Sequence, residues 1–118
     1  GKITGSDIAK AAVAAAAHNV QSAALNGVIS LETKAISQLS LSDASGLLVA
    51  NPPWGVRLND GSILDTYREI GQLARRYPQW KLCLIASDAK LVKKTGIKFT
   101  NVSPLIPMGG IRIRFYLG

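Results

Sequence analysis

The sequence has 118 residues, with 14 Lys or Arg against 7 Asp or Glu, and a formal net charge of +7. This length suits one compact domain, and a hydrophobic content of 47% excludes disorder caused by low hydrophobicity. The surplus of positive charge favours a polyanionic partner such as RNA or DNA. The single cysteine, Cys83, excludes an internal disulfide framework and a structural zinc site. We predict a cytoplasmic protein with no metal site and no membrane segment.

The first third of the chain predicts a strand, a helix and a second strand. Residues 2–7 form the first strand, and the alanine-rich residues 8–25 form a helix that Asn26-Gly27 ends. Residues 28–31 form the second strand, and 32–41 continue it less regularly. One face of the helix is expected to pack on a sheet through small side chains, namely Ala12, Ala16, Val20 and Ala23.

The middle of the chain predicts two buried strands on either side of an amphipathic helix. Residues 46–50 are a continuous apolar run, which is typical of a parallel strand covered on both faces. Two prolines end it, because proline cannot donate to a strand ladder. A helix is expected over 62–77 and the next buried strand over 81–86. The apolar face of the helix consists of Ile63, Tyr67, Ile70 and Leu73.

The last third predicts a short helix and an antiparallel hairpin. Ser87-Asp88 is expected to cap a helix over 89–94 that Gly96 closes. Residues 98–102 and 111–117 are expected to pair as a hairpin, with a proline-rich turn between them. The whole order predicts one cooperative α/β unit with a mostly parallel sheet and a C-terminal antiparallel hairpin.

Ligands of open parallel sheets bind beyond the carboxyl ends of the strands, and one such end carries an acidic residue. Asp7 follows the first strand, where a carboxylate can hold the hydroxyls of a ribose. Alternatively, Asp7 only caps the helix behind it, because Asp is a favoured cap residue. The residues alone leave both interpretations open.

The segment Asn51-Pro52-Pro53-Trp54-Gly55 is a more specific signal at the end of another strand. Its prolines fix the backbone, so that the Asn51 side-chain oxygen and the Pro52 carbonyl can point to one spot as acceptors. Such a pair would bind an exocyclic amino group, and Trp54 would stack on the attached ring. The alternative is a simple turn beside a core aromatic residue.

These motifs resemble a known family. Asn51-Pro52-Pro53-Trp54, with Gly5-Ser6-Asp7-Ile8 earlier in the chain, resembles the Asn-Pro-Pro-aromatic branch of the class I S-adenosylmethionine-dependent methyltransferases. The chain looks most similar to the bacterial enzymes that methylate the 2-amino group of guanine in large-subunit ribosomal RNA. The likeness extends over nearly the whole sequence, and it implies a partial Rossmann-like methyltransferase fold.

The resemblance also implies roles for individual residues. Asp7, Ile8 and Asn51 would bind the cofactor, S-adenosyl-L-methionine, with Asp7 on its ribose. The catalytic segment would be Asn51, Pro52, Pro53 and Trp54, acting by positioning without a covalent intermediate. Arg57, beside that segment, would contact the nucleic acid.

Two departures from the family pattern affect these expectations. Ala35 stands where relatives usually have an acidic residue that contacts the adenine. The family's first strand and its Gly-rich loop, expected before Lys2, are not in this sequence. We therefore expect the C-terminal part of the catalytic domain of a longer enzyme, inactive or nearly so in isolation. The central strand would be missing, with its gap closed by pairing of the flanking strands or by strand exchange in a homodimer.

Other functions remain open from the sequence. The chain could be a non-catalytic nucleic-acid-binding module with a degenerate methyltransferase fold, or it could methylate the amino group of adenine in DNA. Most basic residues are expected to be solvated surface, including Lys90, Lys93, Lys94 and Lys98. His18 is interpreted as structural and Cys83 as an inert small hydrophobe.

Overall fold

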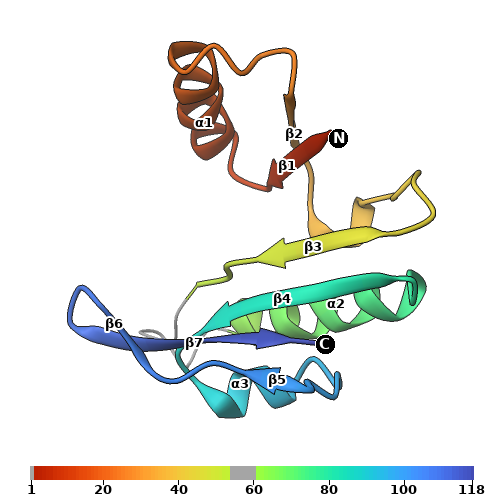
Figure 1. The fold of residues 1–118 in the computed structure, drawn as a ribbon, viewed down its shortest axis with the longest axis vertical. Helices are drawn as coiled ribbons and strands as arrows, with labels where there is room; N and C mark the ends of the chain where they lie inside the picture. The colour runs from red at the N-terminus through yellow and green to blue at the C-terminus, as the bar shows by residue number, and fades with distance from the viewer. Residues whose placement is uncertain (1, 54–60) are drawn as a thin grey trace. The chain divides into compact units, whose positions relative to one another are not determined.

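The computed structural model describes residues 2–53 and 61–118 (Figure 1). The chain divides into two compact units, residues 1–40 (unit 1) and residues 41–118 (unit 2), and each is described by itself. Within the described ranges, no helix has the length and apolar character needed to cross a membrane.

Unit 1 is a small parallel strand pair joined through a helix. Strands β1 (Ile3–Asp7) and β2 (Ile29–Thr33) pair in parallel, with α1 (Lys10–Ser22) between them in the chain. A single 3₁₀ turn, η1 (Ile36–Gln38), follows β2. The predicted order of strand, helix and strand is confirmed for this unit.

Helix α1 is shorter at both ends than the sequence predicts. At its start, the backbone N–H of Ala9 donates to Asp7 Oδ1 at 2.8 Å, and this local turn keeps Ile8 out of the helix. At its end, Ala24 has a left-handed φ of 58°, and α1 stops at Ser22, three residues before the predicted end at Leu25. The expected small-residue face is also only partly right, because the half-buried positions of α1 are Val13, Ala16 and Val20.

Unit 2 is a mixed sheet with two helices. In the sheet, β3 and β4 are parallel, β7 is antiparallel to β4, and both β5 and β6 pair antiparallel with β7. The predicted parallel and antiparallel parts are therefore both present, with the antiparallel pairs at the C-terminal end. Its elements are β3 (Gly46–Ala50), α2 (Gly61–Arg76), β4 (Trp80–Ala86), α3 (Ala89–Lys93), β5 (Asn101–Val102), β6 (Ile106–Met108) and β7 (Ile111–Leu117).

Strand β6 was not foreseen. The predicted proline-rich turn is in part this strand, in which Pro107 lies opposite Arg112 of β7. Proline is tolerated there because β6 pairs with β7 alone in the described sheet and so has a free side. The actual turn is Gly109-Gly110, with φ of 55° and 90°, the two positive values that a two-residue type I′ hairpin requires.

The core of unit 2 lies between α2 and one face of the sheet. Figure 1 shows α2 running along β4 on a single side of the sheet. The predicted apolar face of α2, with Ile63, Tyr67, Ile70 and Leu73, is buried as expected. Alternate residues of β4, namely Leu82, Leu84 and Ala86, are buried as well. Burying side chains of this size contributes about 2 kcal/mol each, so α2 and β4 are the most firmly held elements of the unit.

The expected pairing of the strands that end at Asp7 and at Ala50, directly or by strand exchange, stays a prediction, because these strands belong to different units. In the described part of the chain, β1 pairs with β2 and β3 pairs with β4, and the two pairs belong to separate sheets. A parallel partner on one side satisfies only half of a strand's backbone groups. In the described sheets, β1, β2 and β3 therefore each have one edge that no strand covers, whereas β4 is paired on both sides.

Candidate active site and cofactor site

The polar turn after β3 lies at the carboxyl end of a parallel strand. Asn51 is exposed, Pro52 is buried and Pro53 is exposed. Neither proline has an N–H, and each has a fixed φ, so the chain leaves the sheet here without forming further ladder bonds. The buried Pro52 anchors the turn, while the carboxamide of Asn51 faces solvent, where a ligand can reach it.

A tyrosine from α2 binds this turn. Tyr67 has no exposed surface, and its hydroxyl donates to the Pro53 carbonyl oxygen at 3.4 Å. In the described residues, no donor bonds to the Pro52 carbonyl or to the Asn51 side chain. The acceptor of Pro53 is thus occupied, whereas the two acceptors assigned from the sequence have no partner among residues 2–53 and 61–118.

Sequence reasoning missed the role of Tyr67, although a signal was present. The residue was assigned only to the apolar face of its helix, which is correct for the ring. A buried tyrosine hydroxyl nevertheless needs a hydrogen-bond partner. A tyrosine among Ile and Leu on the apolar face of a helix that follows a proline turn could have suggested the bond.

The surroundings of Tyr67 keep its hydroxyl protonated. Burial, with smaller contributions from the nearby Asp88 carboxylate and from Tyr116, raises the pKa of Tyr67 to about 12. Asp88 follows β4 and caps α3, since its Oδ1 accepts from the N–H of Lys90 at 2.8 Å. The predicted cap at this position is confirmed. At neutral pH, Tyr67 is therefore a hydrogen-bond donor.

In unit 1, Asp7 ends β1 with an exposed side chain. One carboxylate oxygen, Oδ1, is held by the N–H of Ala9, while α1 itself has no side-chain cap. Asp7 therefore forms a turn before the helix and does not act as its cap. The other oxygen, Oδ2, has no partner in the described part of the chain, so it can accept from a ligand hydroxyl. Ile8, the next residue, is 74% exposed.

Two predicted site residues, Trp54 and Arg57, lie outside the described residues, as does Gly55. Of the remainder, Asp7 and Ile8 belong to unit 1, and Asn51, Pro52 and Pro53 belong to unit 2. The residues that the structure brings together are therefore Asn51, the two prolines and Tyr67.

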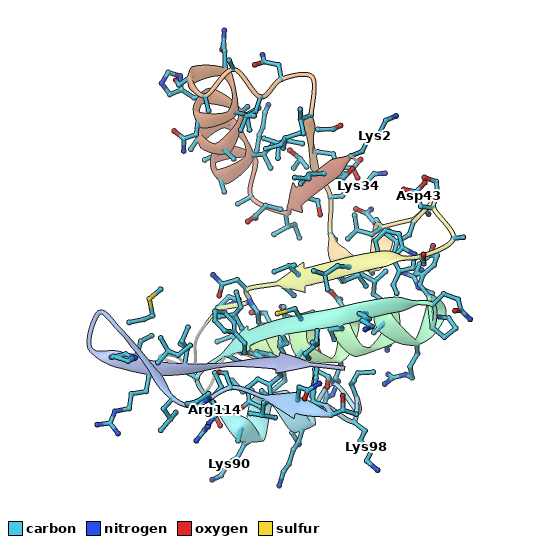
Figure 2. All side chains as sticks on the ribbon, in the orientation of Figure 1. Lys2, Lys34, Asp43, Lys90, Lys98 and Arg114 are labelled. Carbon is cyan, nitrogen blue, oxygen red and sulfur yellow. The ribbon has the colours of Figure 1, made fainter. Side chains whose placement is uncertain are left out.

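The basic residues on α3 and after it face solvent, as predicted. Lys90, Lys93, Lys94 and Lys98 are all exposed. Figure 2 shows Lys90 and Lys98 extending away from the ribbon of unit 2.

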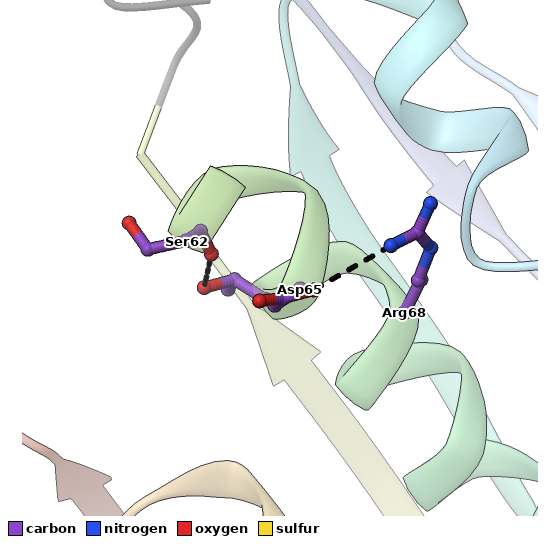
Figure 3. A network of polar contacts seen from close by, with 4 residues as sticks. Ser62, Asp65 and Arg68 are labelled. Atoms are coloured by element: carbon purple, nitrogen blue, oxygen red, sulfur yellow. Dashed lines mark hydrogen bonds and ion pairs between the residues drawn. The ribbon is translucent and has the colours of Figure 1, made fainter. Parts of the chain in front are cut away.

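Exposed polar side chains also cover the first turns of α2, where Arg68 lies 3.5 Å from Asp65 and the Thr66 hydroxyl donates to the Ser62 carbonyl at 2.9 Å (Figure 3). An exposed pair of this kind contributes well under about 1 kcal/mol. Within the residues that the structure describes, no group of three or more metal-binding side chains occurs.

Comparison with known proteins identifies the family. Residues 1–102 match the family model described as "RMKL-like, methyltransferase domain". The chain is 32% identical over 117 residues to the ribosomal RNA large subunit methyltransferase K/L of Methylococcus capsulatus, covering 98% of this chain and 16% of that protein. It thus spans about one sixth of the length of this relative.

Solved structures share the fold. The crystal structure of SMU.472 in complex with SAH matches with a TM-score of 0.89 at 24% identity, over 98% of this chain and 30% of that one. A predicted N6-adenine-specific DNA methylase from Listeria monocytogenes matches with a TM-score of 0.82 at 26% identity, over 98% and 29%. The resemblance inferred from Asn51-Pro52-Pro53 and Asp7 is thereby confirmed, and the chain belongs to the family of RMKL-like methyltransferase domains.

Proposed function

We propose that this chain is the part of a methyltransferase catalytic domain that binds S-adenosyl-L-methionine and presents the amino group of a nucleobase, guanine in large-subunit ribosomal RNA, for methylation. The observation that carries this proposal is the turn after β3. There the exposed Asn51 carboxamide and the Pro52 carbonyl have no partner in the described residues, while the Pro53 carbonyl is bonded to Tyr67. The named relative from Methylococcus capsulatus supports ribosomal RNA as the substrate. A cytoplasmic location is part of the same proposal.

The base would be held at this turn by two hydrogen bonds. The Asn51 side-chain oxygen and the Pro52 carbonyl accept from the two N–H groups of the amino group. Accepting both hydrogens turns the nitrogen lone pair toward the methyl donor and stabilises the positive charge that develops on the nitrogen. Trp54 would stack on the base ring, and Arg57 would contact the nucleic acid. No general base is required if the proton leaves to solvent after transfer.

The residues of unit 1 fit the cofactor. Asp7 presents one free carboxylate oxygen, and the Ala9 N–H fixes the other, so the carboxylate is oriented to accept from a ribose hydroxyl. Exposed Ile8 offers an apolar contact beside it. S-adenosyl-L-methionine, when bound, supplies a methyl group on a positively charged sulfur.

One observation favours a second function, a nucleic-acid-binding module without catalysis. Ala35 has no polar side chain where relatives usually carry an acid, and its backbone N–H donates to Gln38 Oε1 at 3.2 Å. The contact to the adenine amino group would then be absent. In this case, the chain would bind RNA but not the cofactor.

The proposal is tested in a chimera in which this chain replaces the matching segment of the Methylococcus capsulatus enzyme, because the chain alone is expected to be inactive or nearly so. We expect methyl transfer to ribosomal RNA in the chimera and a loss of about a hundredfold in kcat for Asn51→Ala. Asn101→Ala, which removes an exposed carboxamide on β5, is the matched control and should keep full activity.

Cofactor binding is measured in the chain itself by calorimetry. Asp7→Ala should weaken S-adenosyl-L-methionine binding about tenfold, because a hydrogen bond to a charged group is lost, whereas Asp43→Ala should have no effect. A chimera that binds RNA, binds no cofactor and transfers no methyl group would establish the second function. Transfer to adenine in DNA, with none to guanine in RNA, would replace the proposed substrate.

A further inference from the structure

We propose that Tyr67 is a positioning residue for the accepting base, because its hydrogen bond to the Pro53 carbonyl fixes the turn that carries Asn51 and the Pro52 carbonyl. The inference rests on the proposed function, since a fixed pair of acceptors matters only when an amino group binds them. Tyr67 acts through the turn and contacts neither the base nor the cofactor. It is therefore a positioning residue and not a catalytic one.

Among the described residues, the Pro53 carbonyl is the one hydrogen-bond partner of the Tyr67 hydroxyl, which has no access to water. Tyr67 is fully buried, and its oxygen lies 3.4 Å from the Pro53 carbonyl oxygen. A buried hydroxyl without a partner is costly, so the side chain and the turn hold each other in place. Asp88 and burial keep this hydroxyl in the donating form.

The restraint at Pro53 reaches the two acceptors through a stiff segment. Both prolines have φ fixed by their rings, so few torsions remain free between the Pro53 carbonyl and the Asn51 backbone. Pro52 is buried, which removes further freedom. Holding the carbonyl of Pro53 thus sets the direction of the Pro52 carbonyl and the position of Asn51.

The position of α2 along its own axis is fixed by close packing, and this fixes the position of Tyr67. Gly71 lies one turn after Tyr67, and a Cβ at this position would collide with the backbone carbonyl of Thr95. Arg75, one turn further, donates from Nη1 to the same carbonyl oxygen at 2.7 Å. Thr95 is fully buried, and its hydroxyl donates to the Val92 carbonyl. Its backbone is therefore held in place and prevents α2 from shifting along its axis.

A second tyrosine binds the chain on the other side of β3. Tyr77 directly follows α2, and its hydroxyl accepts from the N–H of Leu41 at 3.1 Å. Tyr67 and Tyr77 thus bond to backbone groups after and before β3. Only the first of these bonds touches the turn with the acceptors, so Tyr77 is a matched control for the loss of one phenolic hydrogen bond.

The test compares Tyr67→Phe with Tyr77→Phe in the full 118-residue chain. Both changes keep the ring and remove one hydroxyl. NMR relaxation of the Asn51 side-chain amide measures how firmly the turn is held, and titration with guanosine monophosphate measures recognition of the base. Tyr67→Phe should increase the mobility of Asn51 and weaken guanosine monophosphate binding about fivefold. Tyr77→Phe should change neither value beyond experimental error, although it lowers stability to a similar extent.

The outcomes separate the two proposals. If Asn51 stays equally ordered in Tyr67→Phe, or loses order equally in Tyr77→Phe, the positioning role is overturned. If the unchanged chain binds no guanosine monophosphate, yet Tyr67→Phe alone mobilises Asn51, the positioning role stands and base recognition in the proposed function fails.

If Tyr67→Phe does not fold, 3-fluorotyrosine at position 67 replaces it, because it keeps the ring and makes the hydroxyl a stronger donor. The carbonyl carbon signal of Pro53 must then shift, and the absence of a shift overturns the role.

Discussion

Units 1 and 2 contain similar elements but differ in what they bury. Within residues 2–40, no side chain is fully buried, and α1 contributes no buried residue. Unit 2 contains the buried face of α2, the alternate residues of β4 and the fully buried Thr95. An isolated pair of strands and one alanine-rich helix of 13 residues are each marginal in water. Unit 1 is therefore expected to be the less stable of the two.

This difference bears on how the candidate site residues within each unit are held. The turn with Asn51 is fixed from behind by Tyr67 and hence by the core of unit 2. Asp7 is fixed by a local bond from the N–H of Ala9, by the pairing of β1 with β2, and by the N–H of Lys34, which donates to the Asp7 carbonyl at 3.0 Å. A site residue supported by a core keeps its geometry without ligand, whereas one on a marginal unit gains order when ligand binds.

The largest expected effect is the loss of a core side chain. Leu84 on β4 has no exposed surface, and Leu84→Ala should lower the free energy of unfolding of unit 2 by about 3–4 kcal/mol, because it removes burial and leaves a cavity. Amide hydrogen exchange in β4, followed by NMR, measures this for unit 2 separately. Leu31→Ala, at a half-buried position of β2, should cost unit 1 only about 1 kcal/mol. Equal losses for the two changes would contradict the contrast between the units.

A second comparison uses two glycines. A Cβ at Gly71 would collide with the backbone of Thr95, whereas a Cβ at Gly27 would meet no atom within 4 Å. Gly71→Ala should destabilise unit 2 by about 2–3 kcal/mol, even though alanine is the better helix former by about 1 kcal/mol. Gly27→Ala should be neutral or slightly stabilising. Thermal unfolding followed by circular dichroism measures both, and a neutral Gly71→Ala would show that α2 can move away from Thr95.

Because of Tyr67, the free energy of unfolding of unit 2 should fall at alkaline pH. Its pKa is about 12 in the folded state against about 10 in the unfolded state. Below pH 10, both states hold the proton, so the ionisation of Tyr67 adds no pH dependence to the free energy of unfolding. Between pH 10 and 12, the unfolded state loses the proton first, and the free energy of unfolding should fall by up to about 2–3 kcal/mol. Urea unfolding at several pH values measures the fall, and Tyr67→Phe should be less stable at neutral pH but lack this part of the decline. If the free energy of unfolding fell equally with pH in the unchanged chain and in Tyr67→Phe, the pKa of Tyr67 would not be raised by folding.

Much of unit 2 could be predicted because its signals are local and agree with one another. The apolar run of β3, the helical spacing on α2 and the cap at Asp88 each predict one element. The expected burial of β3 on both faces is wrong, however, because Leu47 and Val49 are 56% and 62% exposed. Strand β6 could not be predicted in the same way, because Pro107 argues against a strand unless the position is known to have a free side. That information comes from the sheet order and not from the segment itself.

The candidate site was predictable to a similar degree. The polar residues after two strands identify Asp7 and Asn51 as ligand-binding candidates, and their roles stay predictions. The bond from Tyr67 to Pro53 could not be predicted, because it depends on the position of α2 along its axis relative to Thr95. The close approach of Gly71 to the backbone of Thr95 sets this position. A glycine in a helix does not by itself indicate which backbone segment it packs against.

The smallest expected effect concerns the end of α1, where the sequence led to the wrong stop. Ala24 has a φ of 58°, a left-handed conformation that costs a residue with a Cβ about 1 kcal/mol. Ala24→Gly should therefore stabilise unit 1, by less than about 1 kcal/mol because glycine also loses more entropy on folding. Ala23→Gly is the control: Ala23 has a φ of −86°, so the same change there should lower stability. Amide exchange in α1 measures both variants. A gain from Ala23→Gly, or a loss from Ala24→Gly, would mean that the helix ends closer to Asn26-Gly27, as the sequence alone suggests.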